Sequence, residues 1–207
     1  MALARLDVDW QSVVVPDDVQ RLLHEAGRRI EEFSRDRDRS PIPGFVPSDF
    51  VTVYRVLSAV VDADLAPGHL FCEWGSGLGV VTCLASMLGL DATGIEIEAE
   101  LVDESRQLAQ EYDLPAEFLH GSFIPAGGED LAEATDGIAW LDTSSSAAHD
   151  PMELEPEDFD VIFAYPWPGE ERVVARLFHR YAAHGALLIT YHGLEDPQVR
   201  RKVRKRR

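Results

Sequence analysis

Cysteine is scarce in this chain of 207 residues, and long apolar runs are missing. Its two cysteines, Cys72 and Cys83, are too few for a disulfide scaffold and have no CxxC or Cys/His spacing that binds a metal. No apolar run approaches the ~20 residues that cross a membrane. Asp7 and Asp9 also lie where a signal peptide needs an unbroken apolar segment. We therefore expect a cytoplasmic protein with no metal site and no membrane partner.

Basic residues are few as well: 19 Lys and Arg stand against 37 Asp and Glu, which gives a formal net charge of −18. Seven of the 19 fall within residues 200–207, so the rest of the chain has 12 basic residues against the 37 acidic ones. Because so negative a surface repels phosphate backbones, we expect no nucleic-acid partner. The acidity either attracts a cationic partner, such as a basic protein or an amine, or serves solubility.

The basic C-terminal tail, residues 194–207, allows three interpretations. It is a solubility tag, a clamp on the protein's own acidic surface, or a segment that docks a second subunit. The sequence indicates no oligomeric state.

The hydrophobic content of 45% is enough for one globular domain with its own core. Apolar residues recur at helical spacing after Pro16 and predict a helix over residues 16–33. Residues 41–48 contain three prolines and a glycine, which predicts a loop, and Ser48 is placed to cap a second helix. We assign residues 1–45 to an N-terminal helical extension.

From residue 69 onward, short apolar runs alternate with helical segments. The runs at 70–74, 92–97, 116–121, 159–165 and 185–192 predict five strands. Such alternation favours βαβ units and a mostly parallel α/β sheet. Residues 125–158 interrupt the rhythm, with GIAWL (137–141) as a possible short strand and 142–158 as an acidic, mobile insertion.

A glycine-rich run, Glu73-Trp74-Gly75-Ser76-Gly77-Leu78-Gly79, lies where the first of these strands ends and a helix begins. Glycines there permit a tight turn and a close approach of the backbone to a ligand, and the helix start offers amides to an oxygen-rich group. We expect an adenosine-bearing ligand. The dinucleotide pattern GxGxxG needs glycine or alanine where this chain has Val80, which disfavours an NAD-dependent oxidoreductase.

The spacing E-x-G-x-G-x-G resembles motif I of the Rossmann-like (class I) S-adenosylmethionine-dependent methyltransferases. The resemblance implies a doubly wound, mostly parallel sheet with helices on both faces, and S-adenosyl-L-methionine as cofactor. It also implies that Glu96, at the end of the second strand, binds the ribose hydroxyls, with Glu98 as the alternative on the same strand face. The family commonly has an acid after the third strand to bind adenine, where this chain has Ser122. The residues that we assign to the cofactor are Glu73, Gly75, Ser76, Gly77, Gly79, Glu96, Ile97, Ser122 and Phe123.

The acceptor side is expected at the end of the fourth strand, Ala164-Tyr165-Pro166-Trp167-Pro168-Gly169-Glu170-Glu171. In the family, enzymes that methylate base amines have a motif similar to [DN]-P-P-[YF] at this position. This chain lacks the Asp or Asn whose carboxylate or amide accepts the base amine. Aromatic faces hold sulfonium and ammonium groups by cation–π contacts. We therefore assign Tyr165, Trp167 and Tyr191 to the methyl-transfer pocket, with His192 as a candidate base.

The segments VPSDFVTVYRVL, EWGSGLGVV and GIEIEAELVDESRQLA look most like the compact non-SET protein lysine methyltransferases. This likeness implies an amine acceptor such as a protein lysine, and a methyltransferase domain over residues 46–193. Only residues 193–207 follow the fifth strand, so the usual antiparallel last pair of strands is expected to be missing or displaced. The alternative function is a non-catalytic accessory or sensor protein that only binds the cofactor.

Overall fold

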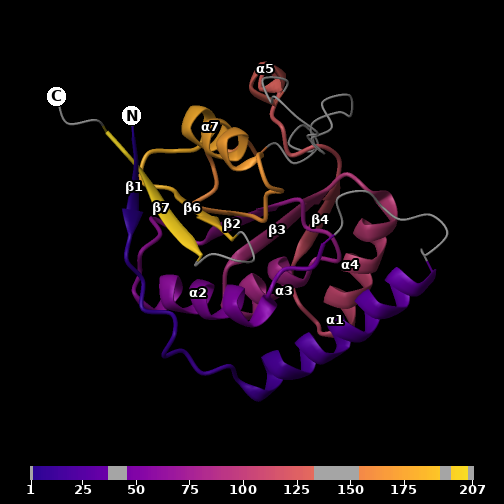
Figure 1. Ribbon diagram of the computed structural model, residues 1–207. Helices are drawn as coiled ribbons and strands as arrows, with labels where there is room; N and C mark the ends of the chain where they lie inside the picture. Colours follow the sequence, from indigo (N-terminus) through magenta and orange to yellow (C-terminus); the bar gives the residue numbers. More distant parts are fainter. Residues whose placement is uncertain (1, 37–45, 133–153, 192–196, 205–207) are drawn as a thin grey trace.

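A computed structural model describes residues 2–36, 46–132, 154–191 and 197–204 of the chain. It contains one seven-stranded sheet in the order β1-β7-β6-β5-β2-β3-β4 (Figure 1). The strands are β1 (Ala2–Leu6), β2 (Leu70–Trp74), β3 (Asp91–Glu96), β4 (Glu117–His120), β5 (Val161–Ala164), β6 (Leu187–Thr190) and β7 (Gln198–Val203). The helices are α1 (Asp17–Asp36), α2 (Phe50–Asp62), α3 (Val80–Met87), α4 (Ala99–Glu111), α5 (Glu129–Ala132) and α7 (Glu171–Tyr181).

The five predicted strands are confirmed as β2 to β6, and they are parallel to one another. β2 pairs with β3 on one side and with β5 on the other, so the chain builds the sheet outward from β2 in two directions. Open α/β sheets bind ligands at the carboxyl ends of the strands where this reversal occurs. The topology therefore places a candidate site at the ends of β2 and β5.

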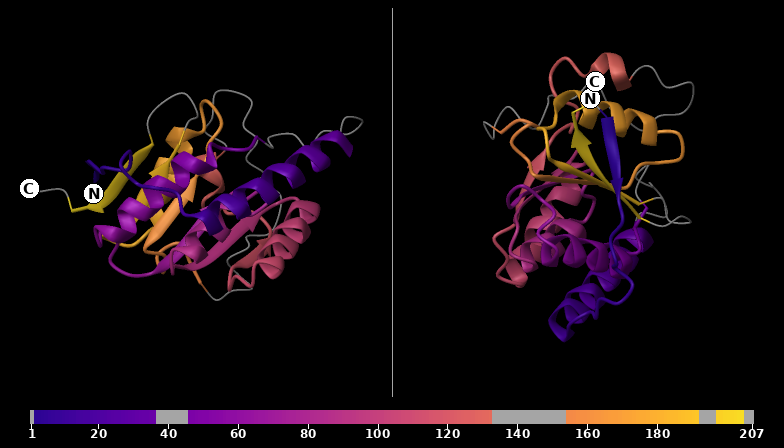
Figure 2. Two further views of the ribbon diagram at one scale, coloured as in Figure 1. Left: turned by 90° about the horizontal axis from the view of Figure 1, so that it is seen from below. Right: turned by 90° about the vertical axis from the view of Figure 1, so that its left-hand side faces the viewer.

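The last antiparallel pair of strands, expected to be missing or displaced, is present, and one of its two strands, β1, comes from the first described residues rather than from those after β6. β7 pairs antiparallel with β6, and β1 pairs antiparallel with β7. Most of the described part of the basic tail is thus a strand of the sheet rather than a solubility tag, because its backbone completes a ladder on both sides. The extension at 1–45 likewise begins with a strand, and both chain ends lie at the same edge of the sheet (Figure 2).

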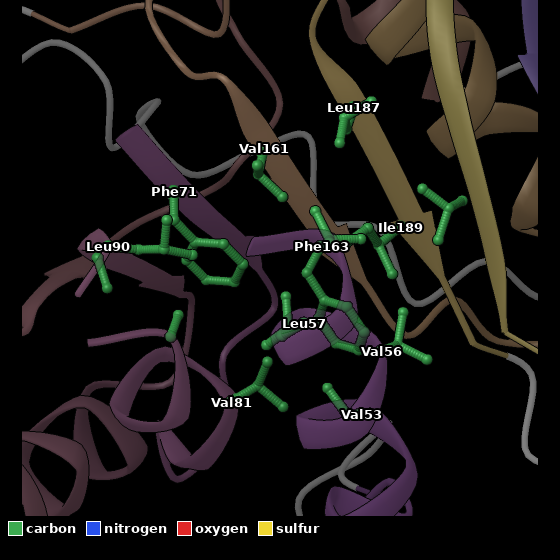
Figure 3. Packing of buried hydrophobic residues seen from close by; sticks show 14 of the residues in the cluster. Val53, Val56, Leu57, Phe71, Val81, Leu90, Val161, Phe163, Leu187 and Ile189 are labelled. Carbon is green, nitrogen blue, oxygen red and sulfur yellow. The ribbon is translucent and has the colours of Figure 1, made fainter. Parts of the chain in front are cut away.

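Helices cover both faces of the sheet, as predicted. α2, α3 and α4 lie on one face and α7 on the other, while α1 packs outside α3 and α4 (Figures 1 and 2). Side chains alternate between these faces along each strand. In β2, Phe71 faces α2 and α3 together with Phe163 of β5 (Figure 3), whereas Cys72 and Trp74 face α7.

Two helix predictions can be compared with the structure. The helix predicted over residues 16–33 is confirmed as α1. The N-cap of α2 is Asp49 and not Ser48, because the Asp49 carboxylate accepts the Thr52 N–H at 3.1 Å and the Thr52 hydroxyl at 2.8 Å. A carboxylate beside the first turn also interacts favourably with the helix dipole.

Some sequence predictions fall on residues that the structure does not describe. The possible strand at 137–141 and most of the insertion at 142–158 fall outside the described residues, as does the predicted base His192. Among the helices of the described ranges, none is long and apolar enough to cross a membrane.

Candidate functional site

A pocket opens at the carboxyl ends of the parallel strands β2, β3 and β5. Its lining comes from the glycine loop after β2, the ends of β3 and β5, and the segments that follow β4 and β5. Ile30 of α1 and Phe50 at the start of α2 also line it, together with residues 46–48. The N-terminal segment therefore forms part of the site, a contribution that sequence spacing alone does not reveal.

The glycine loop crosses the end of β3. The N–H groups of Gly75 and Ser76 both donate to the Ile95 carbonyl, at 3.0 and 2.9 Å. Gly75 and Gly77 have positive φ angles of 77° and 53°, a region that residues with a side chain rarely adopt. A Cβ at Gly75 would meet nothing within 4 Å, so backbone and open space lie together at this point of the pocket wall.

Two other glycines serve packing. A Cβ at Gly79 would lie 2.5 Å from the Phe118 ring, and Gly79 is not among the residues that line the pocket. Gly79, which we predicted to bind the cofactor, therefore contributes to the pocket only indirectly, as the N-cap of α3. Gly94 of β3, which the sequence analysis did not single out, allows the loop to approach, because a Cβ there would lie 2.8 Å from the Ser76 Cβ.

Glu96 ends β3 and joins that strand to the glycine loop. One carboxylate oxygen accepts the Gly77 N–H at 2.8 Å, and the other accepts the N–H groups of Ile97 at 2.7 Å and Glu98 at 3.0 Å. The side chain is buried, and burial raises its pKa above the usual value while these bonds lower it. A carboxylate has about four acceptor positions, and three of those of Glu96 are used, so its Oε2 can still accept one hydroxyl donor from the pocket. Glu98, the alternative ribose ligand, is exposed and lines the same pocket.

Glu73 is buried beside the loop on the α3 face. Its Oε2 accepts the Thr82 N–H at 2.9 Å and the Thr82 hydroxyl at 2.6 Å. Burial raises the pKa of Glu73 to about 8, with a further rise from the negative charge of Glu96. Glu73 also lines the pocket, and its raised pKa favours the protonated carboxylic acid near neutral pH.

Trp74 belongs to the same motif, although no role was predicted for it. It lines the pocket from the α7 face, and its ring stacks on Phe123 with centroids 5.2 Å apart and an interplanar angle of 9°. Phe123 and Ser122, two of our cofactor candidates, follow β4 and line the pocket, and the Ser122 hydroxyl accepts the Ile124 N–H at 3.2 Å.

Two buried polar atoms of this wall have no partner within the described residues: Trp74 Nε1 and Ser76 Oγ. A buried donor without a partner costs about 1–3 kcal/mol. Both residues line the pocket, so a polar ligand there could satisfy them. With the open backbone at Gly75 and the carboxylate of Glu96, these residues fit an adenosine-bearing cofactor.

The segment between β5 and α7 is where the sequence predicts the acceptor side. Its Tyr165 and Trp167, our candidates for that role, line the pocket. Glu170, the N-cap of α7, lines it too; its side chain is buried and accepts the Trp167 N–H at 3.2 Å. The pocket thus combines aromatic rings with a carboxylate.

Tyr191 takes a different place from the one predicted. Its ring packs against Tyr165 with centroids 5.7 Å apart, but it belongs to the core between the sheet and α2 and does not line the pocket. The Tyr191 side chain is buried in this core and contacts the Tyr165 ring from the side away from the pocket. Burial also raises the pKa of its phenol.

No group of three or more His, Cys, Asp or Glu side chains within the described ranges could hold a metal ion. The two cysteines are both buried, and burial raises the pKa of Cys83 to about 12.

No protein-family model and no curated protein matches the sequence. Solved structures do resemble the fold. An RNA methyltransferase from Salinibacter ruber in complex with S-adenosyl-L-homocysteine shares 17% identity at a TM-score of 0.54, over 78% of this chain and 96% of that one. A methyltransferase from Geobacter sulfurreducens shares 14% identity at a TM-score of 0.54, over 92% of each chain.

A third likeness is to an O-methyltransferase from Bacillus cereus, also in complex with S-adenosyl-L-homocysteine. It shares 14% identity at a TM-score of 0.53, over 86% of this chain and 67% of that one. The chain therefore has the Rossmann-like fold of class I methyltransferases. None of these three structures is described as a lysine methyltransferase, and fold alone does not define an acceptor.

Proposed function

We propose that the protein is an S-adenosylmethionine-dependent methyltransferase that acts on an amine. The observation that carries the proposal is the Glu96 carboxylate, which lies at a strand end in the pocket and is fixed by the Gly77 N–H of a glycine loop. The carboxylate can accept a hydrogen bond from a ribose hydroxyl, and the glycine loop beside it lets the backbone approach the ligand closely. An adenosine cofactor requires both. The unpartnered Trp74 and Ser76 atoms support the same ligand.

When bound, the cofactor would supply a sulfonium methyl group: the lone pair of an amine would form an N–C bond to the methyl carbon while the S–C bond breaks and S-adenosylhomocysteine leaves. The protein's part is to align the two reactants and to exclude water. Ile30 and Phe50 close the pocket with apolar surface, while Glu96 would hold the ribose. An amine must lose a proton before it reacts, and His192 remains our candidate for the base.

An amine acceptor is favoured by the chemistry of the segment after β5. Tyr165 and Trp167 present aromatic rings, which attract ammonium groups. Glu170 adds a buried carboxylate to the same wall, and a negative charge there would favour a cationic acceptor over a neutral alcohol. A lysine side chain combines the required cation with a long apolar stem.

The alternative, a binding protein without catalysis, is favoured by the small size of the chain and by the expectation that the last strands are missing. Those strands are present as β7 and β1, so only the small size still favours it. Titration calorimetry with S-adenosylmethionine, S-adenosylhomocysteine and NAD tests the cofactor: we expect binding of the first two only. Transfer of labelled methyl groups to basic proteins and small amines then tests catalysis. Cofactor binding without transfer to any amine would favour the alternative.

A further inference from the structure

Positive charge is concentrated in three elements of this acidic protein. β1, α7 and β7 contain seven of the 19 Lys and Arg residues and one of the 37 Asp and Glu residues, Glu171. We call these seven residues the basic end: Arg5, Arg172, Arg176, Arg180, Arg200, Arg201 and Lys202. The described part of the basic tail is therefore continuous with arginines from two other parts of the chain.

Several of these side chains share one face. Arg5 of β1 lies directly opposite Arg200 of β7, and Leu3 lies opposite Lys202. The Lys202 ammonium donates to the Ala182 carbonyl at the end of α7, so this face of β7 packs toward α7. By strand alternation, Arg5 and Arg200 point to the same side.

Few positive charges of the basic end are compensated by an ion pair. In the described chain, Arg5, Arg172 and Arg176 have no ion pair and no side-chain hydrogen bond, whereas Arg180 pairs with Asp130 at 2.9 Å. Arg200 Nε is buried and has no partner among the described residues. Like charges that face each other across strands or along a helix are destabilising. An anionic ligand would relieve this repulsion.

A shallow groove crosses the same face between β1, α5 and α7. Its floor is aliphatic, from Leu3, Leu131 and Ala175, and Arg176, His179 and Arg180 complete its lining. Such a groove fits an apolar side chain whose neighbours are acidic.

The outer edge of β1 is open. β1 ends the strand order, and no strand of the described chain pairs with its outer side (Figure 2). Every second residue there presents backbone N–H and C=O groups outward, which is a template for another extended chain.

We propose that the basic end binds an extended acidic segment of a partner protein, which adds to the sheet beside β1. Acidic side chains would meet Arg5 and Arg176, and an apolar side chain would enter the groove at Leu3. A nucleic acid has no backbone that can extend a β-ladder, and the aliphatic floor of the groove, Leu3, Leu131 and Ala175, has no aromatic ring on which a base could stack. A second copy of the chain would bring two basic ends together, which repel.

The test uses the full-length protein and a fluorescein-labelled peptide that alternates glutamate with leucine. We expect the peptide's fluorescence anisotropy to rise on binding and the affinity to fall with added salt. The same peptide with N-methyl groups on alternate amides keeps its charges but loses backbone N–H donors for the β-ladder. We expect it to bind much more weakly. A control peptide in which lysine replaces every glutamate should not bind.

Charge-reversal variants locate the site. Arg5→Glu and Arg176→Glu should each weaken peptide binding by about tenfold or more. Arg21→Glu is the matched control, since Arg21 is an exposed arginine of α1 with the same change of charge. The affinity for S-adenosylhomocysteine should be unchanged in all three variants, which separates this site from the pocket and from the proposed function.

Four results would overturn the proposal. They are no binding of the peptide, equal binding of its N-methylated form, an equal effect of the Arg21 control, and displacement of the peptide by poly(U) at lower concentration than by unlabelled peptide. Sedimentation that shows a dimer which Arg5→Glu dissociates would assign the edge to a second copy instead.

Discussion

The Glu96 carboxylate accepts the Gly77 N–H at 2.8 Å, across 19 residues of sequence. This bond connects the end of β3 to the loop after β2, so the two parts of the candidate cofactor site hold each other in place. The loop also donates two backbone N–H groups to the Ile95 carbonyl. A change at either partner is therefore expected to affect the geometry of both.

Replacing Glu96 tests the ribose role. Glu96→Gln keeps the shape of the side chain but removes its charge and one acceptor. We expect the binding of S-adenosylhomocysteine to weaken by about 1.5–3 kcal/mol, roughly 10-fold to 150-fold in Kd. Calorimetry measures this directly, with Glu98→Gln as the control at the exposed neighbour. A larger loss in the control would transfer the ribose role to Glu98.

The loop conformation is tested at Gly77, whose φ is 53°. A β-branched residue is strained there, so Gly77→Val should destabilise the fold by about 1–3 kcal/mol and abolish cofactor binding. Gly89 has a φ of 81°, a Cβ there would meet nothing within 4 Å, and the residue lies after α3 and outside the pocket lining. Gly89→Val should lose similar stability and keep cofactor affinity. Equal affinities in both variants would place the cofactor elsewhere.

The buried Glu73 makes stability depend on pH. Its pKa is raised from 4.5 to about 8, so between these values the folded chain holds a proton that the unfolded chain has released. Raising the pH through this window therefore destabilises the fold, and the effect levels off above it. Glu96, whose pKa is also raised, acts in the same direction.

Glu73→Gln isolates this contribution. The amide oxygen can accept both Thr82 bonds, so the fold should persist while the loss of melting temperature between about pH 5 and pH 8 becomes smaller. Thermal unfolding over that range measures the difference, with the exposed Glu98→Gln as control. An unchanged pH profile would show that Glu73 is ionised in the fold.

Removal of residues 198–207 tests the role of the tail. Without β7, the buried residues of β6 lose their neighbour and β1 loses its only pairing partner in the described chain. We expect the cooperative thermal transition to be lost or strongly lowered. Arg201→Gln is the control, because it reduces charge and keeps the strand. If truncation and this substitution had equally small effects, the tail would be the charge tag that its composition suggests.

Sequence patterns predicted the elements whose signal is local. Five strands appeared as short apolar runs, and α1 as a helical stripe, because burial dictates both patterns. The glycine loop and Glu96 were found because backbone freedom and strand-end acids leave a spacing that can be recognised.

The misses have non-local causes. β7 has the sequence QVRRKV, which contains few apolar residues. It is a strand because it pairs with the preceding strand β6 on one side and with β1, from the far end of the sequence, on the other. Tyr191 was placed in the pocket because it ends a strand, but its side chain points to the α2 face. The contributions of Ile30 and Trp74 to the pocket depend on tertiary packing, which spacing does not encode.

The pairing of β1 with β7 joins residues about 200 positions apart, such as Ala2 and Val203. β1 is therefore made long before its partner strand β7. Until then β1 has no neighbour, and the edge of β6 is uncovered. Contacts between distant residues form slowly, because a long loop has to close first. The sheet is thus completed only after β7 has been made, and before that the nascent chain passes through a stage with two open edges that a chaperone can protect.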